Sequence, residues 1–135
     1  VKPSPGVIGN VLKALRTSTP TKFTLNEKRC MTYAQQLADN FAKICELESG
    51  TYHFAAANGS SATDGLSTYE CAKVVARKLG ASQEDIDRLI LPNPDRYTDR
   101  FRDFRLSADK LAGNGIALGT FEGNVDRCLA DFGWL

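Results

Sequence analysis

The stretch from Thr24 to Gly50 constrains the fold more than any other part of this chain. Thr24 and Glu27 stand in the S/T-x-x-E spacing of a capping box, which marks the start of a helix. Apolar residues then recur at steps of three and four, on one helical face, at Cys30, Ala34, Leu37, Phe41, Ile44 and Cys45. Gly50 can end a helix in the left-handed conformation. The pattern predicts one long amphipathic helix over about 25–49, which needs partners along its apolar stripe.

Further helices are predicted on both sides of this central one. Ser67 and Glu70 repeat the capping-box spacing, Ser82 and Thr120 are caps for two later helices, and Asn93 is the cap of a helix that reaches Leu111. With 135 residues the chain is long enough for one core. We therefore expect an all-α fold, a compact bundle of about five to six helices around the central one. It forms a single domain over 1–135, with an extended tail at 1–4 and a long loop at 51–65.

Four cysteines leave two alternatives open. Cys30 and Cys45 lie fifteen positions apart on the expected helix, roughly 22 Å, which is too far for a disulfide. If the central helix packs antiparallel to the one after the loop, Cys45 comes level with Cys71. That arrangement predicts a Cys45–Cys71 disulfide and leaves Cys30 to pair with Cys128. The alternative is four reduced cysteines that act as small apolar side chains.

Composition bears on partners and compartment. The formal net charge of +1 provides no long-range field to attract DNA, RNA or an anionic membrane. No apolar run approaches the roughly 20 residues of a membrane span, so we expect no transmembrane segment, although docking on a membrane-bound complex is compatible with the sequence. A start at Val1 without an initiator methionine, together with the even cysteine count, favours a processed chain in a lumenal or secreted compartment.

The residues offer little for catalysis or for metal and cofactor binding. His53 is the single histidine, and no C-x-x-C or H-x-x-x-H spacing is present, so we expect no metal site and no cofactor. A Cys–His nucleophile pair of His53 with Cys71 is conceivable, but a lone histidine beside aromatic residues is more often structural. We expect a protein that is not an enzyme.

The expected function is therefore protein–protein docking, as an accessory or extrinsic subunit of a larger assembly. Trp134 and Leu135 form a pair of large apolar residues at the chain end, where residues are usually exposed, and such a pair can anchor a contact. The long loop supplies three more candidate contacts, namely Tyr52, His53 and Phe54. The alternative is that these side chains pack into the core.

Two other functions stay open. A small-ligand carrier would enclose an apolar pocket between helices, lined by Phe41, Tyr97, Phe101 and Phe104. The stretch LGASQEDIDRLILPNPDRYTDRF, continued through ALGTF, resembles the death-domain superfamily over roughly Ser67 to Leu129. The resemblance implies a helical signalling adaptor that docks on similar modules. The chain departs from that family in lacking a tryptophan in the second helix, in its long loop and in having no sixth helix after Gly133.

Overall fold

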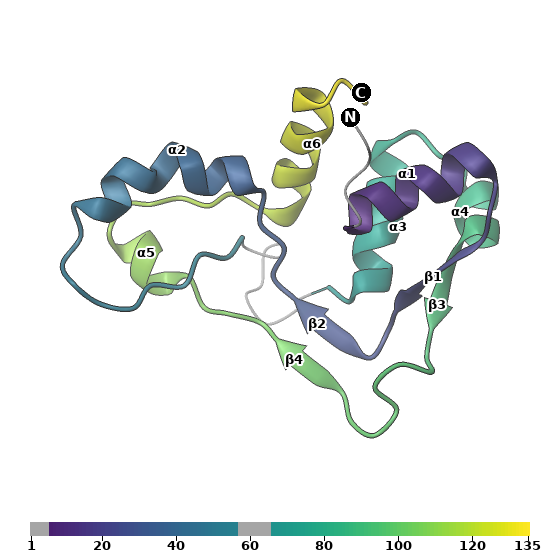
Figure 1. Cartoon of the computed structure of the whole chain (residues 1–135), viewed down its shortest axis with the longest axis horizontal. Coiled ribbons are helices and arrows are strands. Elements are labelled where there is room, and N and C mark those ends of the chain that lie inside the picture. Colours follow the sequence, from purple (N-terminus) through teal and green to yellow (C-terminus); the bar gives the residue numbers. More distant parts are fainter. Residues whose placement is uncertain (1–5, 57–65) are drawn as a thin grey trace. The chain divides into compact units, whose positions relative to one another are not determined.

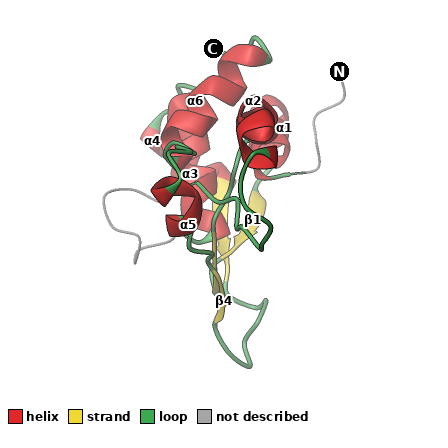
Figure 2. Cartoon of the chain, turned by 90° about the vertical axis from the view of Figure 1, so that its left-hand side faces the viewer, coloured by secondary structure: helices red, strands yellow, loops and turns green. Residues whose placement is uncertain are grey.

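The computed structural model describes residues 6–56 and 66–135, and it mixes helices with strands in these ranges (Figures 1 and 2). The described part contains six helices and four strands in two small sheets. The all-α bundle is therefore wrong. The elements in chain order are α1 (Val7–Thr17), β1 (Thr21–Thr24), β2 (Glu27–Arg29), α2 (Ala34–Cys45), α3 (Thr68–Lys78), α4 (Gln83–Leu89), β3 (Ile90–Asn93), β4 (Arg102–Phe104), α5 (Asp109–Gly113) and α6 (Phe121–Asp131).

The long central helix over 25–49 does not form, because its first part is extended. Thr24 is buried at the end of β1, which runs parallel to β3 with Thr24 opposite Asn93. Glu27 is also buried, and its carboxylate accepts a short hydrogen bond from the hydroxyl of Thr68. Strand pairing and a partner distant in sequence thus replace the expected capping box, and the helix that remains is the twelve-residue α2.

The chain divides into two compact units, and each is described by itself. Unit 1 comprises Val1–Lys28, Leu66–Asp103 and Leu135. In this unit α1 packs on α3, and the parallel pair of β1 and β3 lies against α3 (Figure 1). Its core is made of fully buried apolar side chains, the largest of which are Val11, Val75, Ile86, Leu89 and Ile90.

Three helix starts confirm the capping predictions. Ser67 and Glu70 form a complete capping box at the start of α3. The Ser82 hydroxyl accepts the backbone N–H of Asp85 at the start of α4, and that of Thr120 accepts the N–H of Gly123 at α6. Local hydrogen bonds of this kind depend on residues within one turn, so a sequence reveals them directly.

The predicted helix from Asn93 to Leu111 is wrong. Asn93 is the last residue of β3, and Tyr97 has a φ of 60°, a left-handed conformation that ends any regular helix there. Arg102 then donates its N–H to the carbonyl of Asn26, and β4 pairs with β2. Tyr97, Phe101 and Phe104 recur at steps of four and three, a helical period, and strand pairing overrides this local pattern.

Unit 2 comprises Arg29–Gly65 and Phe104–Trp134 and carries α2, α5 and α6. One apolar cluster lies between α2 and the α5 region, and its buried members are Leu111, Ile116 and Leu118. Half-buried side chains pack against it from the end of α2, from the segment that follows and from the turn before α5; they are Ile44, Leu47, Tyr52, Phe54 and Ala108. Of the expected 51–65 loop, residues 51–56 have no regular structure and 57–65 lie outside the described residues.

The predicted disulfides, Cys45–Cys71 and Cys30–Cys128, are wrong because all four cysteines are free thiols. Cys30 and Cys45 were expected on one helix, but Cys30 precedes α2. Its sulfur accepts the N–H of Leu106 at 3.4 Å and lies 3.7 Å from the same residue's carbonyl oxygen. Cys71 and Cys128 are buried and serve as small core side chains.

None of the helices in the described ranges is both long enough and apolar enough to cross a membrane.

The thiols should separate by burial when the native protein meets an aromatic disulfide reagent at about pH 8. We expect exposed Cys45 to react first and half-buried Cys30 more slowly. Cys71 should not react until the chain unfolds, because burial raises its pKa to about 12. Burial also raises the pKa of Cys128, which should be slow for the same reason. Mass spectrometry of labelled peptides identifies each site. Cys71 reacting as fast as Cys45 would contradict this arrangement.

Candidate docking face on helix α2

Helix α2 is held by its sides rather than by its ends. The residue before it, Tyr33, makes no side-chain cap, and the first turn carries no acidic residue. None of its twelve residues is fully buried. Since an isolated helix of this length is marginal in water, contacts along its length must keep it in place.

The side of α2 that faces the rest of unit 2 is mainly polar. Half-buried Gln36 donates from Nε2 to the carbonyl of Leu118 at 3.4 Å, and its Oε1 accepts from Arg127 at 3.4 Å. Asn40, one turn later, is half-buried and donates to the backbone carbonyl of Gln36 at 2.8 Å. Two amide side chains thus occupy positions where an amphipathic helix usually carries apolar residues.

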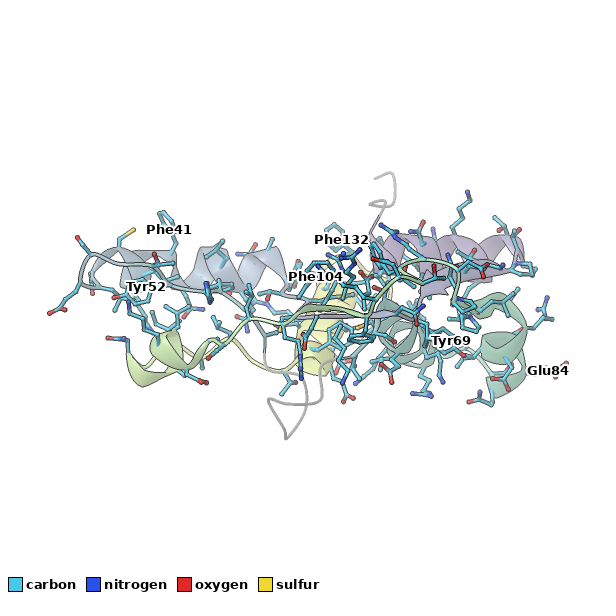
Figure 3. The ribbon with its side chains drawn as sticks, turned by 90° about the horizontal axis from the view of Figure 1, so that it is seen from below. Phe41, Tyr52, Tyr69, Glu84, Phe104 and Phe132 are labelled. Carbon is cyan, nitrogen blue, oxygen red and sulfur yellow. The ribbon has the colours of Figure 1, made fainter. Side chains whose placement is uncertain are left out.

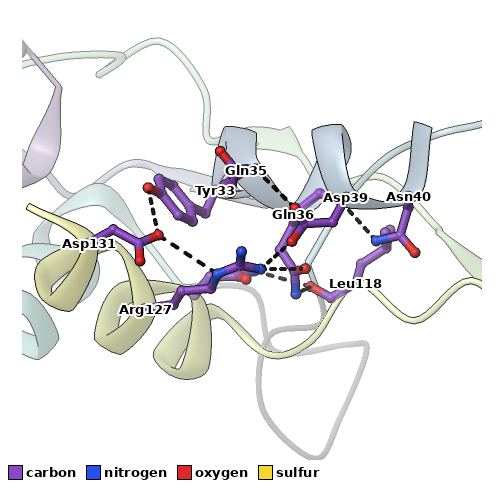
Figure 4. Close-up of polar contacts among 9 residues, drawn as sticks. Tyr33, Gln35, Gln36, Asp39, Asn40, Leu118, Arg127 and Asp131 are labelled. Atoms are coloured by element: carbon purple, nitrogen blue, oxygen red, sulfur yellow. Dashed lines mark hydrogen bonds and ion pairs between the residues drawn. The ribbon is translucent and has the colours of Figure 1, made fainter. Parts of the chain in front are cut away.

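Arg127 on α6 is the centre of these contacts (Figure 4). Its guanidinium lies 2.6 Å from the carboxylate of Asp39 on α2 and 3.8 Å from that of Asp131 on its own helix. The Tyr33 hydroxyl, just before α2, donates to Asp131 at 3.1 Å. One cation therefore joins α6 to two residues of α2, Gln36 and Asp39, and the Tyr33–Asp131 bond adds a third link just before α2.

These contacts shift the pKa values of their members. A hydrogen bond from Gln35, followed by the one from Arg127, lowers the pKa of Asp39 below its ordinary value of 3.8. The bond with Asp39 is in turn the main cause that raises the pKa of Arg127. Both shifts favour the ionised pair at neutral pH.

Apolar contacts hold the C-terminal end of α2. Ile44 in its last turn and Leu47 just beyond it pack against the cluster of Leu111, Ile116 and Leu118. Helix α2 is thus fixed by amide and charged side chains over most of its length and by aliphatic side chains at its C-terminal end.

The opposite side of α2, which we call the outer face, is apolar and exposed. Leu37 is 42% exposed and Phe41 60% exposed. Figure 3 shows Phe41 pointing away from α5, whereas Tyr52 lies between α2 and α5. At 100° per residue the outer face covers an arc of about 140°. Its members carry no charge and are all exposed, namely Ala34, Leu37, Ala38, Phe41, Ala42 and Cys45.

The expected inward stripe thus faces outward for the most part. Of the residues that the sequence placed inside, Ile44 alone packs against the unit 2 cluster, and Leu37 and Phe41 are exposed. No sequence pattern singled out Gln36 and Arg127, whose contacts hold the polar side of α2 against the rest of unit 2. The 3.6-residue period identifies an apolar stripe but carries no information on which partner covers it.

The other candidate contacts differ in exposure. His53 and Leu135 are exposed, the latter at 66%. Trp134 is half-buried and stacks on Phe132, with ring centroids 5.0 Å apart. Tyr52 and Phe54 pack on the unit 2 cluster, and the Tyr52 ring also lies 4.1 Å from the ammonium of Lys110.

Most of the aromatic side chains proposed to line a ligand pocket are exposed. Of the aromatic side chains expected to line a carrier pocket, Phe41, Phe101 and Phe104 are each at least 46% exposed. The Phe104 ring is covered instead by the guanidinium of Arg29 at 4.8 Å. Within residues 6–56 and 66–135, no three histidine, cysteine or acidic side chains are grouped so as to hold a metal ion.

Comparison with family models, curated proteins and solved structures gave no match in any of the three. The all-helical arrangement implied by the death-domain resemblance is not found, because the stretch from Ser67 to Leu129 contains β3 and β4.

Removal of the central guanidinium should loosen α2 specifically. In Arg127→Ala we expect faster amide hydrogen exchange across Ala34–Cys45, because the helix loses its contacts with Asp39 and Gln36 at once. Arg88→Ala is a matched control, since the ion pair of Arg88 with Asp85 at 2.6 Å lies within α4. Equal exchange in the two variants would show that Arg127 does not position α2.

The contact between Arg127 and Asp39 should weaken in acid. The folded state lowers the pKa of Asp39, so the stabilisation is complete above 3.8 and is lost as the pH falls through the still lower folded value. Protection of the α2 amides, corrected for intrinsic exchange, should therefore decline below about pH 4. In Asp39→Asn the protection should be lower at neutral pH, and its decline in acid should be smaller. An unchanged acid profile in that variant would contradict the role of Asp39.

Proposed function

We propose that this chain is a non-enzymatic docking module that binds another protein through the outer face of α2. The observation that carries the proposal is the exposure of Leu37 and Phe41 on a helix whose polar side is already engaged. Single exposed apolar residues are normal on proteins, whereas a contiguous apolar face marks a contact site. Its place in a larger assembly would be that of an accessory subunit.

The outer face also limits the chemistry of its partner. No charge lies among its six residues, so a charged group placed against it would lose water without gaining an ion pair. An amphipathic helix with its own apolar stripe satisfies this requirement and is a common occupant of such surfaces. We expect the contact to be apolar at its centre.

A second contact is proposed at the end of the chain. Phe132 is 47% exposed and Leu135 66% exposed, on either side of half-buried Trp134. Trp134 already stacks on Phe132, so binding of a partner to the indole would cost little further side-chain entropy. Large apolar side chains of this kind are suited to anchor a contact with another protein.

Polar substitution of the outer face should separate binding from folding. Because Leu37 and Phe41 are exposed, Leu37→Ser with Phe41→Ser should change the unfolding free energy by less than about 1 kcal/mol. The immobilised variant should lose at least ~90% of the protein that wild type retains from an extract of the native source, as expected when contact anchors are removed. Quantitative mass spectrometry of the eluates measures the loss.

Phe101→Ser is the matched control, because it removes another exposed phenylalanine that lies outside α2. It should leave retention at the wild-type level. Identical eluates from wild type and the α2 variant would contradict the proposal, as would equal losses in the variant and the control.

A further inference from the structure

We infer that the protein docked on the outer face of α2 is a second copy of this chain, with the two α2 helices antiparallel across a two-fold axis. The inference rests on the proposed docking function and names its partner. It follows from the order of large and small residues on the face, from the charges at the helix ends and from the size of the face.

The order of residues on the outer face is self-complementary. In an antiparallel pair, residues at the same level have numbers with a constant sum. When that sum is 79, the two faces are centred on each other, and Phe41 lies level with Ala38 of the second copy. In the same register Leu37 meets Ala42, and Cys45 meets Ala34. Each of the three larger side chains is therefore opposite an alanine.

The face also has the relief that close helix packing requires. Leu37, Phe41 and Cys45 follow one another at steps of four and form a raised ridge. Their three alanine counterparts form a low ridge beside it. In a two-fold contact the same patch serves both copies, so each of these levels combines one larger side chain with one alanine, and the two helices can approach closely. A self-complementary surface of this kind requires no second type of partner.

Charges favour the antiparallel over the parallel arrangement. No charged residue lies on the outer face, so symmetry brings no like charges together there. The C-terminal end of α2 is followed by exposed Glu46 and Glu48, whereas its first turn carries no acidic residue and no side-chain cap. Antiparallel packing places the acidic end of one copy beside the positive N-terminal dipole of the other. Parallel packing would bring the acidic ends together.

The size of the face indicates a weak, reversible pair. Twelve helical residues span about 18 Å. The contact area of a strip of that length, one helix wide, is smaller than the ~800 Å² per partner of a standard stable interface. The association should therefore depend on concentration, and the pair should dissociate on dilution.

Sedimentation velocity over a series from about 10 μM to 1 mM measures this equilibrium. We expect wild type to shift toward a dimer as concentration rises. Phe41→Ser should raise the dissociation constant at least tenfold. Ala38→Phe is the decisive variant, because the added ring would collide with Phe41 of the second copy at two equivalent places. It should also weaken the dimer, whereas it would strengthen any association that depends on apolar area alone.

Disulfide trapping tests the direction of the helices. In a Cys30→Ser background, Ala34→Cys should give a covalent dimer with diamide, as the introduced thiol of one copy and the Cys45 thiol of the other each lose a hydrogen to the reagent and join. Within one helix these two positions lie about 16 Å apart, beyond the ~7 Å limit, so they cannot join within one chain. The background protein, which keeps Cys45, should stay monomeric, and so should the control Ala112→Cys on α5.

Three outcomes would overturn the inference. The first is a monomer at every concentration, the second is a stronger dimer in Ala38→Phe, and the third is a Cys45–Cys45 dimer in the background protein, which indicates parallel helices. A monomer whose retention of another protein still depends on Leu37 and Phe41 would leave the docking function standing with a different partner. Loss of both properties would reject the two together.

Discussion

One guanidinium joins two helices of unit 2. Arg127 on α6 contacts a carboxylate and an amide of α2, and Tyr33, just before α2, donates a hydrogen bond to Asp131 on α6. These contacts draw the polar side of α2 inward. Since a helix has only two sides, the apolar stripe must then face outward, and the whole docking proposal follows from that orientation.

The parts of the fold that depend on neighbouring residues could be predicted from the sequence. The capping box of Ser67 and Glu70 and the cap at Thr120 are confirmed because their partners lie within one turn. Thr24 and Glu27 show the same spacing and form no such box, because strand β3 and Thr68 supply their partners from about 40 to 70 positions further along. Nothing in a local pattern tells these two cases apart.

The candidate site was half predictable for a related reason. The period of Leu37 and Phe41 correctly shows that α2 has an apolar side, and α2 is indeed a helix over part of the expected range. The direction of that side depends on where Arg127 lies, 86 positions after Phe41 in the sequence. Gln36 and Asn40 gave a weak signal, because two amides one turn apart suit a polar contact on the inner side as well as they suit solvent.

The relative strengths of the two sides of α2 support a covered outer face. A neutral hydrogen bond contributes only ~0.5–1.5 kcal/mol net, and the Arg127–Asp39 pair is screened because more than a third of each side chain is exposed. Full burial of a leucine or phenylalanine side chain contributes ~1.5–3 kcal/mol. In an isolated chain, the free energy contributed by the polar contacts of Gln36 and Asn40 is thus comparable to the free energy that burial of Leu37 and Phe41 would contribute, and these two side chains stay exposed. A partner on the outer face removes this conflict, because the helix then keeps its polar contacts inside and buries its apolar stripe as well.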